Sequence, residues 1–177
     1  IQKLAAAAVE TYGPVDLFCS NAGIPAAGGA EAQNELWQRC WDIHVMAHVY
    51  AARAVLPSMI ERGGGQIWVL APDDSFAYYL PLPSAPVTHH TRIGAIRALA
   101  KEVSRFGVFA NAAVFQPVAE MAEPAAWNVA RAGVASYAQK FKPQSLAAVA
   151  ETLAFWLSRR TIPMNGSVVQ FGSGVYD

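Results

Sequence analysis

The chain has 177 residues, 54% of them hydrophobic and only 15% charged, and this composition excludes an intrinsically disordered protein. Its 13 basic and 13 acidic residues cancel, which argues against the basic surface of a nucleic-acid-binding protein. Arg53 and Glu61 break up the longest apolar stretch before it reaches the roughly 20 residues of a membrane span. We therefore expect association with neither nucleic acid nor membrane.

The two cysteines, Cys19 and Cys40, form neither a disulfide framework nor a zinc-binding pattern. Because no signal-peptide pattern is present at the start, we expect reduced thiols in a cytoplasmic protein. The first residue is Ile1 rather than Met, and residues 2–12 have the pattern of the later part of an amphipathic helix. We therefore expect further sequence upstream of Ile1.

Short apolar runs alternate along the chain with longer segments of helical periodicity. The predicted helices and strands, in chain order, are helix 2–12, strand 15–20, helix 31–62 with an interruption near Asp42, strand 66–71, helix 87–105, strand 108–115, helix 144–157 and strand 167–171. Strand 15–20 suits burial on both faces, and residues 117–142 form a polar, alanine-rich excursion. This alternation predicts one α/β domain over residues 1–177, with helices on both faces of a parallel sheet.

The order of several short motifs resembles the short-chain dehydrogenase/reductase (SDR) family. The matching pieces are Gly13-Pro14-Val15-Asp16, Ser20-Asn21-Ala22-Gly23-Ile24, Trp41-Asp42-Ile43-His44-Val45, Leu56-Pro57-Ser58-Met59, Gly65-Gln66-Ile67-Trp68-Val69, Leu99-Ala100-Lys101-Glu102, Gly107-Val108-Phe109-Ala110-Asn111-Ala112, Phe155-Trp156-Leu157-Ser158 and Asn165-Gly166. The resemblance runs almost end to end and implies a Rossmann-like, doubly wound parallel α/β sheet. It also implies that the first βαβαβ part of the family fold, with its glycine-rich turn for a cofactor pyrophosphate, is not in this sequence.

The family resemblance further implies a catalytic tetrad of Asn, Ser, Tyr and Lys, and all four positions differ here. They read His44, Pro72, Ala85 and His89 when counted from the neighbouring motifs. Pro72 and Ala85 are separated by the usual interval between Ser and Tyr, so the two counts agree. Since proline has no hydroxyl and alanine no ionisable group, neither can carry out general acid–base work. The Pro-Gly that frames the nicotinamide in the family reads Phe115-Gln116.

For the cofactor, the resemblance assigns contact positions to Asn21, Ala22 and Gly23. Because the glycine-rich turn is missing from the sequence, we expect no cofactor bound by this chain alone. NAD(P) is expected only where the full-length family site is present.

His44 and His89 fall in the former active-site cleft, and three interpretations of them stay open. They are polar fillers of the cleft, an acid–base pair, or metal ligands together with Asp73 and Asp74. His48, one helical turn from His44, completes an H-x-x-x-H spacing that is too weak a signal to predict a metal site.

A different register in residues 72–86 would bring Ser75, Tyr78 or Tyr79 into the site, with Arg92 in place of the lysine. Thr88 and Arg92 are also four residues apart, which is similar to the Tyr-x-x-x-Arg of the related halohydrin dehalogenases.

The helices over residues 42–62 and 87–105 correspond to those that form a four-helix bundle with a neighbouring subunit in the family. They carry several apolar and small residues suited to close approach, namely Met46, Ala47, Tyr50, Ala51, Val55, Ile93, Ala95, Ile96 and Ala98. We therefore expect a homo-oligomer, or a hetero-oligomer with an active SDR subunit.

Within the polar, alanine-rich segment 117–142, Trp127 is the candidate residue for a lid that contacts a ligand.

Three functions follow from these patterns. The first is a degenerate SDR-like protein acting as a non-catalytic or regulatory subunit, alone or with an active dehydrogenase. The second is an NAD(P)-dependent oxidoreductase whose cofactor-binding N-terminus precedes Ile1. The third is a non-redox enzyme, dehalogenase-like or based on His44 and His89, in the former SDR pocket.

Overall fold

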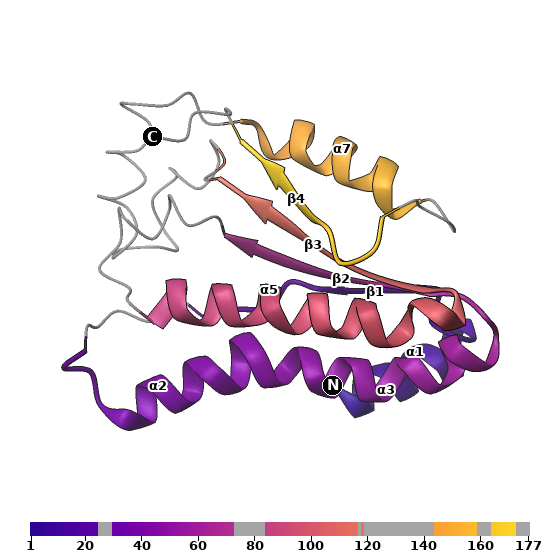
Figure 1. The fold of residues 1–177 in the computed structure, drawn as a ribbon, viewed down its shortest axis with the longest axis horizontal. Helices are drawn as coiled ribbons and strands as arrows, with labels where there is room; N and C mark the ends of the chain where they lie inside the picture. The colour runs from indigo at the N-terminus through magenta and orange to yellow at the C-terminus, as the bar shows by residue number, and fades with distance from the viewer. Residues whose placement is uncertain (25–29, 73–83, 117, 119–143, 159–163, 173–177) are drawn as a thin grey trace.

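A four-stranded parallel sheet forms the centre of the molecule (Figure 1). The computed structural model describes residues 1–24, 30–72, 84–116, 118, 144–158 and 164–172. The strands, in the spatial order of the sheet, are β1 (Leu17–Ser20), β2 (Gly65–Pro72), β3 (Val108–Phe115) and β4 (Val168–Phe171). β2 and β3 pair along all of their residues, from Gly65 opposite Val108 to Pro72 opposite Phe115. The predicted Rossmann-like α/β sheet is confirmed.

Helices cover both faces of this sheet. In chain order they are α1 (Gln2–Tyr12), α2 (Asn34–Trp41), the π-helical turn η1 (Asp42–Met46), α3 (Ala47–Glu61), α5 (Ser84–Val103), the 3₁₀ turn η2 (Ser104–Phe106) and α7 (Leu146–Leu157). α3 and α5 lie on one face, with α1 beside α3, and α7 lies on the other (Figure 1). The strands follow one another in the sheet in their sequence order. If all of their crossover connections had the same hand, every connecting helix would lie on one face of the sheet. α7 lies on the opposite face from α3 and α5, so it is the helix that covers the second face.

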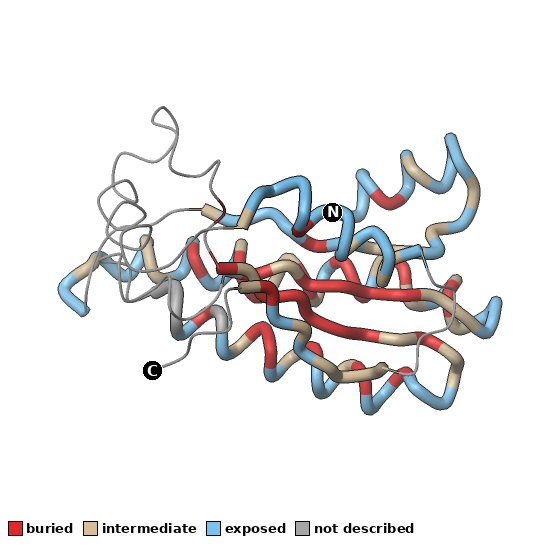
Figure 2. Tube along the Cα trace, turned by 90° about the horizontal axis from the view of Figure 1, so that it is seen from above, coloured by how far each residue is buried: buried red, intermediate tan, exposed pale blue. Residues whose placement is uncertain are grey.

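Two apolar layers result, one on each side of the sheet. Because successive side chains of a strand point to opposite faces, Val108, Ala110, Ala112 and Val114 of β3 pack against α3 and α5. Ala113 faces the α7 side instead. Both faces of β3 are buried, which explains its unbroken apolar sequence. Figure 2 shows the buried residues concentrated in the sheet and on the helix sides that face it.

Two asparagines tie the elements together at the start of β3. Asn165 accepts a hydrogen bond from the Ala110 N–H (2.8 Å) and donates one to the Ala100 carbonyl (3.0 Å). Asn111 donates to the Met164 carbonyl (3.1 Å) and accepts from the Ser167 N–H (3.0 Å). These bonds fix the segment before β4 against both α5 and β3.

β1 differs from the prediction of a strand buried on both faces. In the described part of the chain it pairs only with β2 and forms the edge of the sheet, so Cys19 is exposed and Leu17 and Phe18 are half-buried. Near Asp42, where the sequence predicts an interruption, the helix continues but changes to a π-helical turn over Asp42–Met46. Of the predicted excursion 117–142, the structure describes only Val118, which bridges to Gln144; Trp127 lies outside the described residues.

α2, η1 and α3 form one continuous helix of 28 residues, Asn34–Glu61. In the described part of the chain it is the one helix whose length and mean hydropathy, 1.2 over 18 residues, would suit a membrane span. Its buried side carries Val45, Val55 and Met59, and the latter two belong to the core beneath the sheet face. This packing is that of a core helix in an α/β domain.

Gly107 marks a backbone constraint in the turn between α5 and β3. Its φ is +73°, and a Cβ there would lie 2.5 Å from the Gly63 carbonyl oxygen. We predict that Gly107→Ala lowers the free energy of unfolding by about 2 kcal/mol or more, because the left-handed backbone and the contact are both unfavourable. Urea unfolding measures the change.

Gly94 provides the matched control. It is exposed within α5 with open space around its Cα, so Gly94→Ala is expected to raise the free energy of unfolding by about 0.5 to 1 kcal/mol. Equal effects of the two substitutions would contradict this account.

Candidate functional site

Five polar side chains are buried together between the sheet and the helices on the α3/α5 face. We call Ser20, His44, His48, Thr88 and Arg92 the polar cluster; each is less than 9% exposed. Ser20 ends β1, and Arg92 donates a long hydrogen bond (3.4 Å) from Nη1 to the Leu70 carbonyl near the end of β2. The cluster therefore lies at the carboxyl edge of the parallel sheet, the usual place for ligands in this architecture.

His44 links three segments through both of its ring nitrogens. Its Nε2 accepts a hydrogen bond from the Ile24 N–H (3.1 Å), and its Nδ1 lies 3.1 Å from the Thr88 hydroxyl oxygen. Because a backbone N–H only donates, the neutral ring carries its proton on Nδ1 and donates it to Thr88. The π-helical turn that holds His44 is a form often found at functional positions of helices.

His48 follows on the next turn of the same helix and bonds to the end of β1. Its Nδ1 is 2.7 Å from the Ser20 hydroxyl oxygen, while its Nε2 is buried without a hydrogen-bond partner among the described residues. Burial, and secondarily the nearby Arg92 cation, lower the pKa of both His44 and His48 to about 4. Both imidazoles are therefore neutral at pH 7.

Arg92 is the only cationic member of the cluster and is 4% exposed. Burial lowers its pKa to about 10, which leaves the guanidinium charged at neutral pH. Among the described residues, its Nε has no hydrogen-bond partner and no carboxylate forms an ion pair with it. The site thus contains one buried positive charge.

The segment after β1, which the resemblance assigns to cofactor contact, is exposed at Asn21, Ala22 and Gly23. A Cβ on Gly23 would lie 3.4 Å from the Nε2 of His44, so a larger residue would press on the imidazole. The Ile24–His44 hydrogen bond holds this segment in place.

The other predicted tetrad positions are described through their backbone alone. Pro72 ends β2 opposite Phe115, and Ala85 and His89 lie four residues apart in the first turns of α5. The alternative residues Asp73, Asp74, Ser75, Tyr78 and Tyr79 lie outside the described residues. Within the described ranges, no group of three His, Cys, Asp or Glu side chains is placed to hold a metal ion.

Sequence reasoning found His44 but did not assign Ser20, His48, Thr88 and Arg92 to one cluster. A signal was present, since His44 and His48 are four residues apart, as are Thr88 and Arg92. Residues at this spacing share a helix face, and the two pairs lie on neighbouring helices. Which faces meet depends on the tertiary packing.

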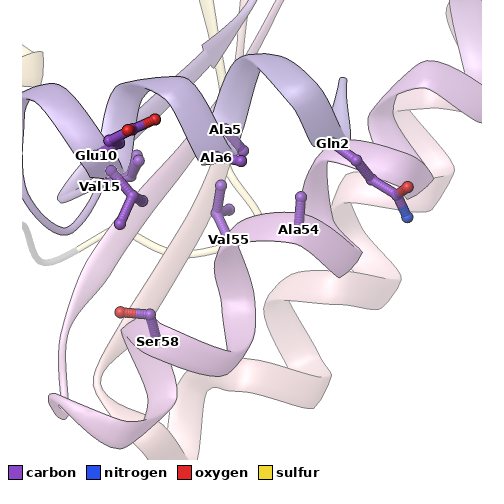
Figure 3. Close-up of a pocket in the computed structure, with 9 residues that line it drawn as sticks. Gln2, Ala5, Ala6, Glu10, Val15, Ala54, Val55 and Ser58 are labelled. Carbon is purple, nitrogen blue, oxygen red and sulfur yellow. The ribbon is translucent and has the colours of Figure 1, made fainter.

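A separate groove of about 460 Å³ runs between α1 and α3 (Figure 3). It is lined mainly by small and apolar side chains, including Ala5, Ala6, Val15, Ala54 and Val55. Ala54 is six residues beyond His48 on α3, about 9 Å along the helix. The groove is therefore distinct from the polar cluster.

A sequence model of the short chain dehydrogenase family matches residues 1–120. The chain belongs to the SDR family. Dehydrogenase/reductase SDR family member 4 of Bos taurus is 33% identical over 115 residues, which cover 62% of this chain and 40% of that protein. A 2-keto-3-deoxy-L-fuconate dehydrogenase of Xanthomonas campestris is 33% identical over 108 residues, covering 60% of this chain and 36% of that protein.

The chain thus spans about two fifths of the length of these curated relatives. Among solved structures, L-sorbose reductase from Gluconobacter frateurii, complexed with NADPH and L-sorbose, superposes with a TM-score of 0.80 at 24% identity. That comparison covers 97% of this chain and 70% of the reductase, and it supports the SDR fold.

The two neutral histidines give the folded protein a defined pH dependence. In the unfolded chain a histidine has a pKa of about 6.5. Above that pH the two imidazoles are neutral in both the folded and the unfolded state, so they do not reduce the free energy of unfolding. As the pH falls from 6.5 towards 4, only the unfolded state binds the protons. We predict that the free energy of unfolding then falls by about 1.4 kcal/mol per pH unit for each histidine.

Urea unfolding between pH 7.5 and 4.5 measures this slope in the parent protein and in His48→Gln, which should lose about half of it. His90 is exposed on α5, and His90→Gln is the matched control. An unchanged slope in His48→Gln would show that His48 is not held neutral in the folded state.

Proposed function

We propose that this SDR-family protein does not transfer hydride through the family's tyrosine–lysine pair and acts as a non-catalytic or regulatory subunit. The observation that carries the proposal is the continuity of α5 from Ser84 to Val103. With no interruption between the Leu99-Ala100-Lys101-Glu102 motif and the start of the helix, the tyrosine and lysine positions fall on Ala85 and His89. The unbroken pairing of β2 with β3 through Pro72 supports the serine position in the same way.

The geometry of His44 argues against the third function, an enzyme with this residue as its base. A general base needs a free nitrogen within reach of the substrate proton. Both nitrogens of His44 are engaged, with Ile24 and Thr88, and the residue is only 5% exposed. This hydrogen bonding supports a role as a fixed, neutral bridge.

The second candidate, an NAD(P)-dependent oxidoreductase, has one specific observation in its favour. Asn21, Ala22 and Gly23 leave an exposed edge beside the polar cluster, where a nucleotide would contact the chain. Relatives with dehydrogenase and reductase names are consistent with it. The absence of a tyrosine at position 85 and of a lysine at position 89 leaves this candidate without the family's proton donor.

The setting we propose is the cytoplasm. Cys19 and Cys40 form no disulfide with each other, and Cys19 is exposed while Cys40 is buried. Thiols of this kind persist in reducing compartments.

The activity assay uses the native full-length protein with NADH or NADPH and a panel of sugar ketones, diketones and β-ketoacyl thioesters. We predict that cofactor oxidation does not exceed the buffer rate. Binding of NADPH is followed separately by its fluorescence, so loss of binding and loss of chemistry are distinguished.

Turnover that disappears in Tyr78→Phe or Tyr79→Phe would overturn the proposal in favour of the oxidoreductase. Turnover that disappears in a His44→Ala/His89→Ala variant would favour the histidine-based enzyme.

The subunit role requires an accessible surface on the helices of the α3/α5 face. Val55, Ile93 and Ile96, which the sequence offered for this surface, belong to the core and are unavailable. Tyr50 on α3 is 44% exposed, and Trp41 at the end of α2 is 40% exposed. These two aromatic side chains support association through this face.

We predict that Tyr50→Glu weakens self-association, or association with a co-purifying SDR subunit, by at least tenfold. Sedimentation over a concentration series measures the change. Tyr12→Glu is the matched control, because Tyr12 lies 88% exposed on α1. Association that is equally affected by both substitutions, or by neither, would contradict the assignment of this face.

A further inference from the structure

Arg92 presents an electrostatic problem that the described residues do not solve. Arg92 is 4% exposed, yet the polar groups that the described residues place around it are the Leu70 carbonyl oxygen and two imidazoles that are neutral at pH 7. Removing a guanidinium from water costs several kcal/mol unless an anion or a full set of acceptors compensates it. A single hydrogen bond of 3.4 Å to the Leu70 carbonyl is weak compensation.

The second unsatisfied atom lies on the facing helix. His48 Nε2 is buried without a partner, as is Arg92 Nε, and these are the two such side-chain atoms in the described ranges. The Thr88 hydroxyl oxygen lies 3.1 Å from the His44 ring. Arg92 and His48 each follow one turn later on these two helices, which run side by side in the same direction (Figure 1), so the two groups are near each other. When the Ser20 hydroxyl donates to Nδ1 of His48, Nε2 carries the proton and becomes a second donor.

We propose that Arg92 and His48 form a binding site for the carboxylate group of a small organic acid. The Nε edge of a guanidinium offers donors that match the two oxygens of a carboxylate, and the imidazole N–H adds a donor from another direction. The anion would satisfy both unpartnered atoms and neutralise the buried cation at once.

The charge at the site selects a monoanion. Arg92 supplies one positive charge, while His44 and His48 are neutral at pH 7 because burial lowers the pKa of each to about 4. A carboxylate balances this single charge, whereas a phosphate ester would leave a buried negative charge. The site does not depend on catalysis by this chain, so it goes beyond the subunit role proposed above.

The test uses ¹³C-formate, the smallest carboxylate, with the native protein at pH 7.5. Saturable broadening of the formate resonance is expected in the parent protein, with formamide as the uncharged probe of the same size showing none. Arg92→Met should weaken formate binding at least tenfold, and Arg97→Met, which removes an exposed arginine of the same helix, should leave it unchanged.

A second readout separates binding from folding. Without formate, Arg92→Met should melt at a higher temperature than the parent, since it replaces an uncompensated buried charge by an apolar side chain. Added formate should raise the melting temperature of the parent and of Arg97→Met, but not of Arg92→Met. If Arg92→Met fails to fold, Arg92→Lys replaces it, because lysine keeps the charge, lacks the planar donor edge and should bind formate about tenfold more weakly.

Absence of saturable formate broadening in the parent protein would overturn the proposal, as would binding that is unchanged in the Arg92 variant. Binding that arises only in an Asp73→Asn/Asp74→Asn variant would also overturn it, because the anion at Arg92 would then be a carboxylate of the chain itself.

Discussion

The neutral imidazole of His44 is the contact on which the arrangement of the carboxyl edge depends. Through Ile24 and Thr88 it joins the segment after β1 to the beginning of α5, with its own backbone in the π-helical turn. Each of these hydrogen bonds uses one ring nitrogen in a defined role, so protonation would break the bond to Ile24. Keeping the ring neutral is therefore a structural requirement at this edge.

Arg92 and the two histidines constrain one another. The buried cation disfavours a second positive charge nearby, which reinforces the effect of burial on the pKa of both rings. In return, the neutral rings cannot provide the negative charge that a buried guanidinium lacks. In one half of the cluster, His44 and Thr88 are joined by a hydrogen bond. In the other half, His48 Nε2 and Arg92 Nε have no hydrogen-bond partner among the described residues. Buried polar networks in protein interiors stabilise most when all members are paired, so the unsatisfied half is where a ligand has most to contribute.

Much of the fold was predictable because each periodic segment reports its own environment. The apolar run 108–115 reads as a strand and is one; α3 and α5 cover one of its faces, α7 covers the other, and β2 and β4 pair with its edges. The apolar run 15–20 looks the same in sequence, yet Cys19 is exposed, because burial of a strand depends on its neighbours in the sheet. His44 was predictable from its motif, whereas the convergence of His48 and Arg92 depends on how α3 and α5 pack, which no local pattern encodes.

The two ends of the sheet hold different kinds of contact. Gly107 and Asn165, two residues of the recognisable motifs, act at the amino end of β3, in a tight turn and in hydrogen bonds to Ala110 and Ala100. The polar cluster and position 72 lie at the carboxyl end, where β2 and β3 finish, roughly 17 Å further along strands rising about 3.3 Å per residue. Side chains at that end can change without disturbing the contacts that specify the scaffold. A family fold is therefore compatible with a carboxyl edge that holds a buried arginine, Arg92, beside neutral histidines.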